Sequence, residues 1–367
     1  MSDGGRSAQE LIEQLAGLTK QVNELMQDAF FDNWALRKQI QMERKLETIR
    51  FERAEHVYLG FHLDTARPIA ARQYHHLPAD FLDAPPQDIP PNSVFLLLNN
   101  DIGRRLPQYL AYVQAHPETL FVVWDWDAQH WIQMSAILAM NSDFYVSGSS
   151  ENASLLAQFT PHVLGPVFVG VHQWSRRFIA ENTPLLLKPR LDTPLGQHAH
   201  YPQYPRRNRA IATVSPTYPT VGFVDNSYKQ RTELENLEEW ARHKTHWIMP
   251  VMGGVPIRVY NALAAGGIPI LPGFYRNLPE IAVLGDIPLY YEVGDLIEAR
   301  RINEAAVARF DAAGESGLLA RVADTLQRHH VDLRCEQILG ALERAVDRIR
   351  RKDRSHDEGY LAIRTTP

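Results

Sequence analysis

The chain has a single cysteine, Cys335, among its 367 residues. One thiol cannot form an intrachain disulfide, and it excludes a zinc site built from several cysteines. No apolar run reaches the roughly 18 residues that a membrane-spanning helix needs, and residues 1–6 lead into a polar helix without the apolar core of a signal peptide. We therefore expect a cytoplasmic protein in a reducing compartment.

The sequence also lacks a basic excess. Its formal net charge is −5 and its pI is about 6.3, whereas general nucleic-acid binding needs a basic surface. No G-x-G-x-x-G follows an early predicted strand, which argues against a dinucleotide-dependent oxidoreductase. With 45% apolar and 22% charged residues, the chain can bury a large core in two domains or one large one.

The first 55 residues predict a helical arm. Apolar side chains at positions 11, 15, 18, 22, 25 and 29 alternate in steps of four and three, so they share one seam of a helix. Residues 34–55 continue as a charged helix. Two interpretations stay open: the seam forms a coiled coil that makes a homodimer, or the helix folds onto its own domain.

Beyond the arm, strands alternate with helices, which is typical of an α/β sheet. We expect strands at 57–61, 93–99, 120–124, 143–147 and 167–171, with helices at 106–115, 130–140 and 151–159. A Pro- and His-rich passage over 182–208 indicates a linker or an active-site loop. A second domain then begins with a predicted strand at 210–214.

The second domain continues with a helix at 231–242, strands at 246–250, 268–271 and 287–291, and amphipathic helices at 303–313, 316–329 and 333–351. The predicted organisation is an arm at 1–55, a domain at 56–175, a linker at 176–208, a second domain at 209–300 and C-terminal helices with a tail at 301–367. The sequence contains no internal repeat.

The stretch 253–272 predicts a loop, a short helix, a tight turn and a buried strand. Pro256 sits where a first helical turn tolerates proline, and the pair Gly266-Gly267 supplies the positive φ that ends a helix. Backbone amides at such a helix start can bind an anion. Arg258 would add a guanidinium beside the phosphates that the amides of Gly254 and Val255 contact.

This stretch resembles the donor-site element of GT-B fold glycosyltransferases, most closely the exostosin-like and spore-protein-like branch, in which a glycine loop, an arginine and an "ALAAG-x-P" turn hold a nucleotide sugar. The resemblance implies two Rossmann-like domains facing a cleft. Residues 222–231 are similar to a second donor-site element of that branch. The donor candidates are Gly253, Gly254, Val255, Arg258, Asn261, Asn226, Lys229, Arg231, Tyr275, Arg276 and Asn277.

One departure from the family pattern concerns an acidic pair that contacts the donor sugar and the ribose in many retaining members. The matching positions here are Gly253 and Asn261, and neither carries a charge. The sequence therefore leaves open whether the anomeric configuration is retained or inverted. It also leaves open a non-catalytic GT-B-like scaffold that dimerises through the arm.

In the first domain, a predicted strand ends in a dense group of polar and aromatic residues at 124–131. We expect Asp127 or His130 to act as the general base and Asp125 to orient it. The predicted acceptor-binding residues are Trp126, Trp131 and His172. The alternative is a metal-dependent GT-A-like transferase, in which Asp125 and Asp127 hold a divalent ion as a D-x-D motif.

The resemblance implies a nucleotide-sugar co-substrate, a glycan, lipid-linked or protein acceptor, and no cofactor or metal. Surface polysaccharide or glycoconjugate synthesis is the expected setting. A basic run at 344, 348, 350–352 and 354 would suit peripheral contact with anionic lipid at the inner face of a membrane, but the interspersed acids favour a solvated helix face.

Overall fold

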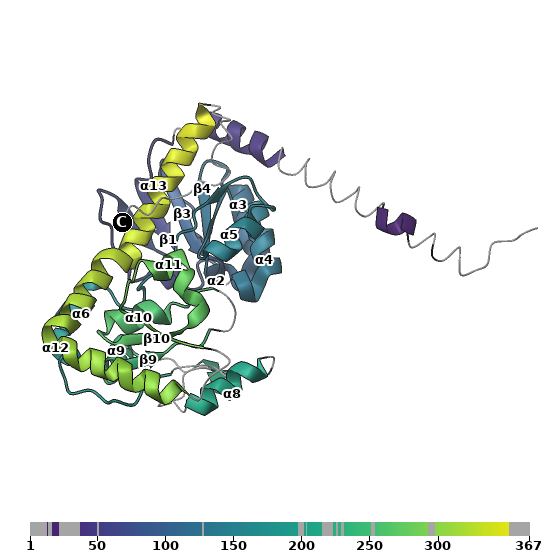
Figure 1. The fold of residues 1–367 in the computed structure, drawn as a ribbon. Helices are drawn as coiled ribbons and strands as arrows, with labels where there is room; N and C mark the ends of the chain where they lie inside the picture. Colours follow the sequence, from purple (N-terminus) through teal and green to yellow (C-terminus); the bar gives the residue numbers. More distant parts are fainter. Residues whose placement is uncertain are drawn as a thin grey trace, which may run out of the picture.

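A computed structural model describes residues 13, 17–21, 37–49, 51–126, 128–196, 202, 204–214, 223–224, 227–228, 231–250, 254–292 and 298–351. Two α/β units follow one another along the chain, each built on a parallel sheet (Figure 1). The predicted α/β class is confirmed. Most of the predicted coiled-coil seam lies outside the described residues, and the predicted domain limits stay predictions.

The first sheet has six parallel strands in the order β2-β1-β3-β4-β5-β6. The central strands β3 and β4 carry only buried side chains, which explains their continuous apolar sequence. The chain reverses its direction of winding between β1 and β3, and in such sheets a crevice opens beyond the carboxyl ends at that switch point. The strands are His56–Leu59 (β1), Gln73–His76 (β2), Ser93–Leu98 (β3), Leu120–Asp125 (β4), Phe144–Ser147 (β5) and Val163–Leu164 (β6).

Helices cover both faces of this sheet. One face packs against α3 (Leu106–Ala115), α4 (Ala128–Asn141) and α5 (Ser150–Leu156). The other face packs against the C-terminal helix α13 (Val331–Arg350) and the helix at 37–48. The short helices η1 (Phe61–Leu63), α2 (Asn99–Ile102) and η2 (Gly103–Arg105) follow the carboxyl ends of β1 and β3.

The helix at 37–48 is part of the first core. Met42 and Leu46 are 3% exposed and pack in the same cluster as α13. The guanidinium of Arg350 donates to the carbonyl oxygens of Ile49, at 2.9 Å, and of Phe51. This part of the predicted arm therefore folds onto its own domain, and dimerisation through the earlier residues stays a prediction.

Lys38 anchors this helix and gives a first testable prediction. Its ammonium lies 2.6 Å and 2.7 Å from the carbonyl oxygens of Ala139 and Met140, in the last turn of α4. Desolvation lowers the pKa of Lys38 to about 7, with Asp143 opposing the shift and Lys45 adding to it. Because the unfolded lysine titrates near 10.5, the unfolded chain binds more protons above pH 7, and stability rises with pH there.

Between about pH 7.5 and 8.5 we expect the free energy of unfolding to increase by at most about 1.4 kcal/mol per pH unit. Urea denaturation at several pH values measures this slope. Lys38→Met should flatten it, whereas Lys188→Met, at a lysine whose side chain is 66% exposed, should leave it unchanged. A slope that persists in Lys38→Met would contradict the assignment.

The second sheet has three parallel strands in the order β11-β10-β9: Leu289–Tyr291, Ile268–Pro272 and Thr245–Trp247. A separate two-stranded antiparallel sheet joins β7 (Phe223–Val224) to β8 (Ser227–Tyr228). Helices α9 and α10 pack with the three-stranded sheet in one apolar cluster. The remaining elements of this unit are α6 (Arg176–Glu181), α7 (Thr183–Leu186), α8 (Pro205–Val214), α9 (Glu233–Ala241), α10 (Arg258–Ala264), η3 (Gly273–Asn277) and α11 (Pro279–Ala282).

Two predicted strands are wrong. Residues 210–214 belong to helix α8, because the proline and arginines that precede the short apolar run begin a helix that continues through it. Residues 167–171 do not join the first sheet. Val171 instead bridges to His330: its amide donates to the His329 carbonyl, and its own carbonyl accepts from Val331, each at 2.8 Å.

The chain ends by returning to the first unit. Helix α12 (Ala299–His329), kinked at Gly314, packs through Ala306 and Phe310 in the apolar cluster of the second unit. Helix α13 packs in the core of the first unit. Figure 1 shows both helices running along one side of the molecule. The three predicted C-terminal helices are thus present, with the first two merged across the kink. Among the described residues, no helix is long and apolar enough to cross a membrane.

Candidate functional site

The predicted loop, helix, turn and strand at 253–272 are present where the chain is described. Helix α10 ends at Ala264, Gly266 follows with the predicted positive φ, 79°, and β10 begins at Ile268. Gly267 is needed for close packing, since a Cβ there would lie 2.4 Å from the His246 ring. Arg258 is the first residue of α10, so the helix begins just after Pro256, which the sequence places in the first helical turn. Gly253 lies outside the described residues.

The loop that follows β10 supports the glycine loop that precedes α10. Tyr275 is fully buried, and its hydroxyl donates to the carbonyl oxygen of Gly254 at 2.7 Å, which holds the glycine loop against η3. The guanidinium of Arg276 lies 4.6 Å from the centre of the Tyr290 ring. Asn277 is exposed at the end of η3. These three candidates therefore follow the carboxyl end of β10, as predicted.

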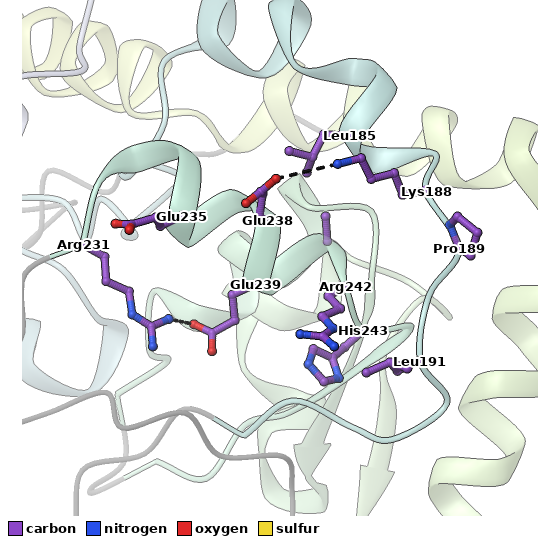
Figure 2. A pocket seen from close by; sticks show the side chains of 11 residues that line it. Leu185, Lys188, Pro189, Leu191, Arg231, Glu235, Glu238, Glu239, Arg242 and His243 are labelled. Carbon is purple, nitrogen blue, oxygen red and sulfur yellow. Dashed lines mark hydrogen bonds and ion pairs between the residues drawn. The ribbon is translucent and has the colours of Figure 1, made fainter.

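Arg231 lies in a different place. It pairs with Glu239 and lines a cavity of about 690 Å³ between α9 and the segment after α7, as Figure 2 shows. Lys188 approaches Glu238 within 3.7 Å across the same cavity. Of the described donor candidates, only Arg231 lines it. Asn226 and Lys229 lie outside the described residues, so the diphosphate contacts proposed for this group stay predictions.

Sequence reasoning missed Arg207, because the passage around it was interpreted as a linker. Helix α8 brings its guanidinium to the carboxyl end of β9, where Nε donates to the Met249 carbonyl at 3.0 Å. Tyr291, at the end of β11, lies close enough for the charge of Arg207 to affect its hydroxyl. If residues 205–214 had been interpreted as a helix, the sequence would have indicated that Arg207 lies in a folded element and not in a linker.

On the first sheet, three residues meet beyond the carboxyl ends of β3 and β4. The Trp126 and His172 rings pack edge to face with centroids 4.6 Å apart. The Trp126 amide donates to Oδ1 of Asn99 at 3.2 Å. The two predicted acceptor residues Trp126 and His172 are therefore neighbours, and Asn99, which the sequence did not single out, completes what we call the polar cluster.

The predicted catalytic residues are only partly described. Asp125 is 2% exposed, and its carboxylate accepts a hydrogen bond from the buried Tyr145 hydroxyl on β5. Asp127 lies outside the described residues. His130 and Trp131 belong to the first turn of α4, and their side chains lie outside the described part. The roles predicted for all four stay predictions.

The two units touch at these candidates. Nδ2 of Asn261, in α10, donates to Oε1 of Gln173 at 2.8 Å, and Gln173 directly follows His172. Ser150, at the start of α5, donates to the Glu280 carboxylate of α11 at 3.3 Å. Burial raises the pKa of Glu280, whose exposure is 1%. Donor and acceptor candidates distant in sequence thus lie on two sides of one junction.

Several buried polar atoms at this junction have no hydrogen-bond partner among the described residues. They are Asn99 Nδ2, Trp126 Nε1, His172 Nδ1 and Asn261 Oδ1. An unsatisfied buried polar group is costly, so a set of them in one place indicates a binding site or bound water. Desolvation, assisted by the nearby His62, lowers the pKa of His172 to about 3, so its ring is neutral at physiological pH.

No group of three or more His, Cys, Asp or Glu side chains that could hold a metal ion occurs among the described residues. The D-x-D alternative is untested by this observation, because Asp127 is not described. On the first sheet, Ser149 caps α5 by accepting from the Asn152 amide.

Comparisons with known proteins leave the family open. No family model matches the chain, and no curated protein sequence matches it. Among solved structures, alpha,alpha-trehalose 6-phosphate synthase from Burkholderia multivorans is similar with a TM-score of 0.41 and 10% sequence identity, over 73% of this chain and 74% of that one. A likeness this distant does not decide the activity of this chain.

Proposed function

We propose that this chain is a glycosyltransferase that moves a sugar from a nucleotide-sugar donor to a glycan, lipid-linked or protein acceptor. The observation that carries the proposal is the hydrogen bond from Asn261 Nδ2 to Gln173 Oε1. It joins the helix of the donor-like element to the residue beside the polar cluster. A transferase needs its two substrates adjacent, and this contact brings the two candidate surfaces together.

The chemistry of the polar cluster suits a sugar. Asn99 Nδ2 and Trp126 Nε1 are donors, and the neutral His172 ring can donate or accept at Nδ1. Hydroxyl groups both donate and accept, so a carbohydrate can satisfy all of these atoms. The Trp126 ring adds an apolar surface for the faces of a pyranose.

The donor side offers positive charge for a diphosphate. Arg207, Arg258 and Arg276 come from three separate segments and lie around the carboxyl ends of β9, β10 and β11. Guanidinium groups bind phosphate oxygens in bidentate pairs and stabilise the leaving group as its bond breaks. We propose that these arginines replace the divalent ion of a D-x-D transferase.

A thermal-shift screen tests the proposal. The purified chain is heated with UDP, GDP, CDP, CMP and dTDP, with and without Mn²⁺, because a ligand that binds only the native state stabilises it by about 2.7 kcal/mol at 100 times Kd. A shift with one nucleotide that needs no metal is the expected result. A shift that requires Mn²⁺ would favour the D-x-D alternative, and no shift at all would favour the non-catalytic scaffold.

The remaining features of the proposal have separate origins. The setting in surface polysaccharide or glycoconjugate synthesis comes from the resemblance, whereas the cytoplasmic location, the homodimer and the peripheral membrane contact come from the composition, the helical seam and the basic run. In the basic run at the C-terminus, Arg350 donates to the backbone around residue 49, and Arg351 pairs with Asp347 at 2.8 Å. A membrane surface would therefore use members of that run other than Arg350, since the Arg351 pair is exposed and weak.

A further inference from the structure

A histidine and an aspartate meet across the switch point of the first sheet. His62 lies in η1, directly after β1, and Asp101 lies in α2, directly after β3. Nδ1 of His62 is 2.6 Å from Oδ1 of Asp101. In open α/β sheets this crevice is the place where ligands bind. The two residues are 39 positions apart, and neither is among the predicted catalytic residues.

Asp101 is held so that it can orient the histidine. Its side chain is 1% exposed, and its carboxylate accepts from the Leu98 amide at 2.8 Å and from the His62 amide at 3.1 Å. Gly60 makes room for it, because a Cβ at that position would lie 1.7 Å from Oδ2. A carboxylate fixed in this way accepts the Nδ1 proton and leaves Nε2 as the basic nitrogen.

The histidine itself faces outward and borders the polar cluster. Its side chain is 44% exposed, in contrast to the buried carboxylate. The Thr65 hydroxyl, two residues after η1, donates to the backbone carbonyl of His172. The charge of His62 is also felt at the His172 ring. The site thus combines an exposed base, a buried orienting acid and adjacent groups suited to a sugar.

We propose that His62 is the general base of the transfer reaction, that Asp101 is its positioning residue, and that the reaction inverts the anomeric configuration. This inference rests on the proposed function. Nε2 of His62 takes the proton of the acceptor hydroxyl while that oxygen forms a bond to the anomeric carbon. The bond from that carbon to the β-phosphate oxygen breaks, and its electron pair leaves with the nucleoside diphosphate. The imidazolium, stabilised by Asp101, then releases its proton to solvent.

The test uses the full chain and measures release of nucleoside diphosphate from UDP-glucose, UDP-N-acetylglucosamine and GDP-mannose, with octyl glucoside as acceptor. We expect His62→Ala to lower kcat by about 10²- to 10⁴-fold, the range of general-base catalysis. Donor affinity, measured by thermal shift, should be unchanged. Added imidazole should restore part of the activity, and NMR should show a product of opposite configuration to the donor.

Asp101→Asn should lower kcat without raising the donor Kd, and His62→Ala with Asp101→Asn together should lose no more than His62→Ala alone, because the two act as a unit. The control is His116→Ala. His116 also pairs with a carboxylate, that of Glu118 at 3.1 Å. It lies on the loop before β4, at the amino ends of the strands, so its removal should leave activity intact.

The outcomes separate the two proposals. A wild-type chain that binds and cleaves none of the donors refutes the proposed function, and the base assignment fails with it. A wild-type chain that is active while His62→Ala keeps full kcat refutes the base assignment alone. A product with retained configuration refutes it as well, since a retaining reaction does not proceed by this single displacement.

Discussion

Replacing Arg258 with alanine is expected to weaken nucleoside diphosphate binding by roughly tenfold to a hundredfold. A hydrogen bond to a charged group contributes about 1.5–3 kcal/mol, and each 1.4 kcal/mol is a factor of ten in Kd. Arg258 is the first residue of α10, and no side chain caps the amides at that end. The amides of Val259 and Tyr260 already donate to the carbonyl oxygens of Pro256 and Ile257, so the expected loss of affinity comes from the guanidinium.

The measurement is a titration of the nucleotide that gives the largest thermal shift, carried out on wild type and Arg258→Ala. The matched control is Arg300→Ala, because Arg300 lies on α12 with a side chain that is 90% exposed. That variant should bind as wild type does. If Arg258→Ala melts at the wild-type temperature without ligand and still binds the nucleotide with wild-type affinity, the donor site lies elsewhere.

The local structure around Arg258 could be predicted because each element has a local signal. A glycine pair ends α10, and an uninterrupted apolar run forms β10. The buried strands β3 and β4 were predicted for the same reason. Helix α8 was missed because its last residues, 210–214, form an apolar run too short to distinguish a strand from a helix end.

The candidate site was harder to predict because it depends on strand order. His62 and Asp101 lie near each other only because β1 and β3 are adjacent while β2 lies outside them. No spacing in the sequence encodes that order. Asp125 shows the converse: the sequence places it among polar residues at a strand end, yet the alternation of side chains along β4 turns it toward Tyr145 in the core.

Gly60→Ala is expected to destabilise the first domain by about 2–4 kcal/mol, combining overpacking with the loss of buried hydrogen bonds. The backbone at Gly60 has φ −58° and ψ 158°, which any residue can adopt, so the cost comes from the collision alone. The new methyl group would occupy the space of Asp101 Oδ2. Either Asp101 leaves its place or the chain after β1 moves.

Both responses separate the carboxylate from His62, so we expect Gly60→Ala also to lower kcat about as much as Asp101→Asn. Urea denaturation and the diphosphate-release assay measure the two effects on the same samples. Gly340→Ala is the matched control: in α13 its methyl group would meet only the flexible end of Arg344, at 3.4 Å, and alanine favours the helix by about 0.5–1 kcal/mol. A Gly60→Ala protein of wild-type stability would show that the carboxylate does not need the space at Gly60, and wild-type kcat would show that its contact with His62 is not needed for the reaction.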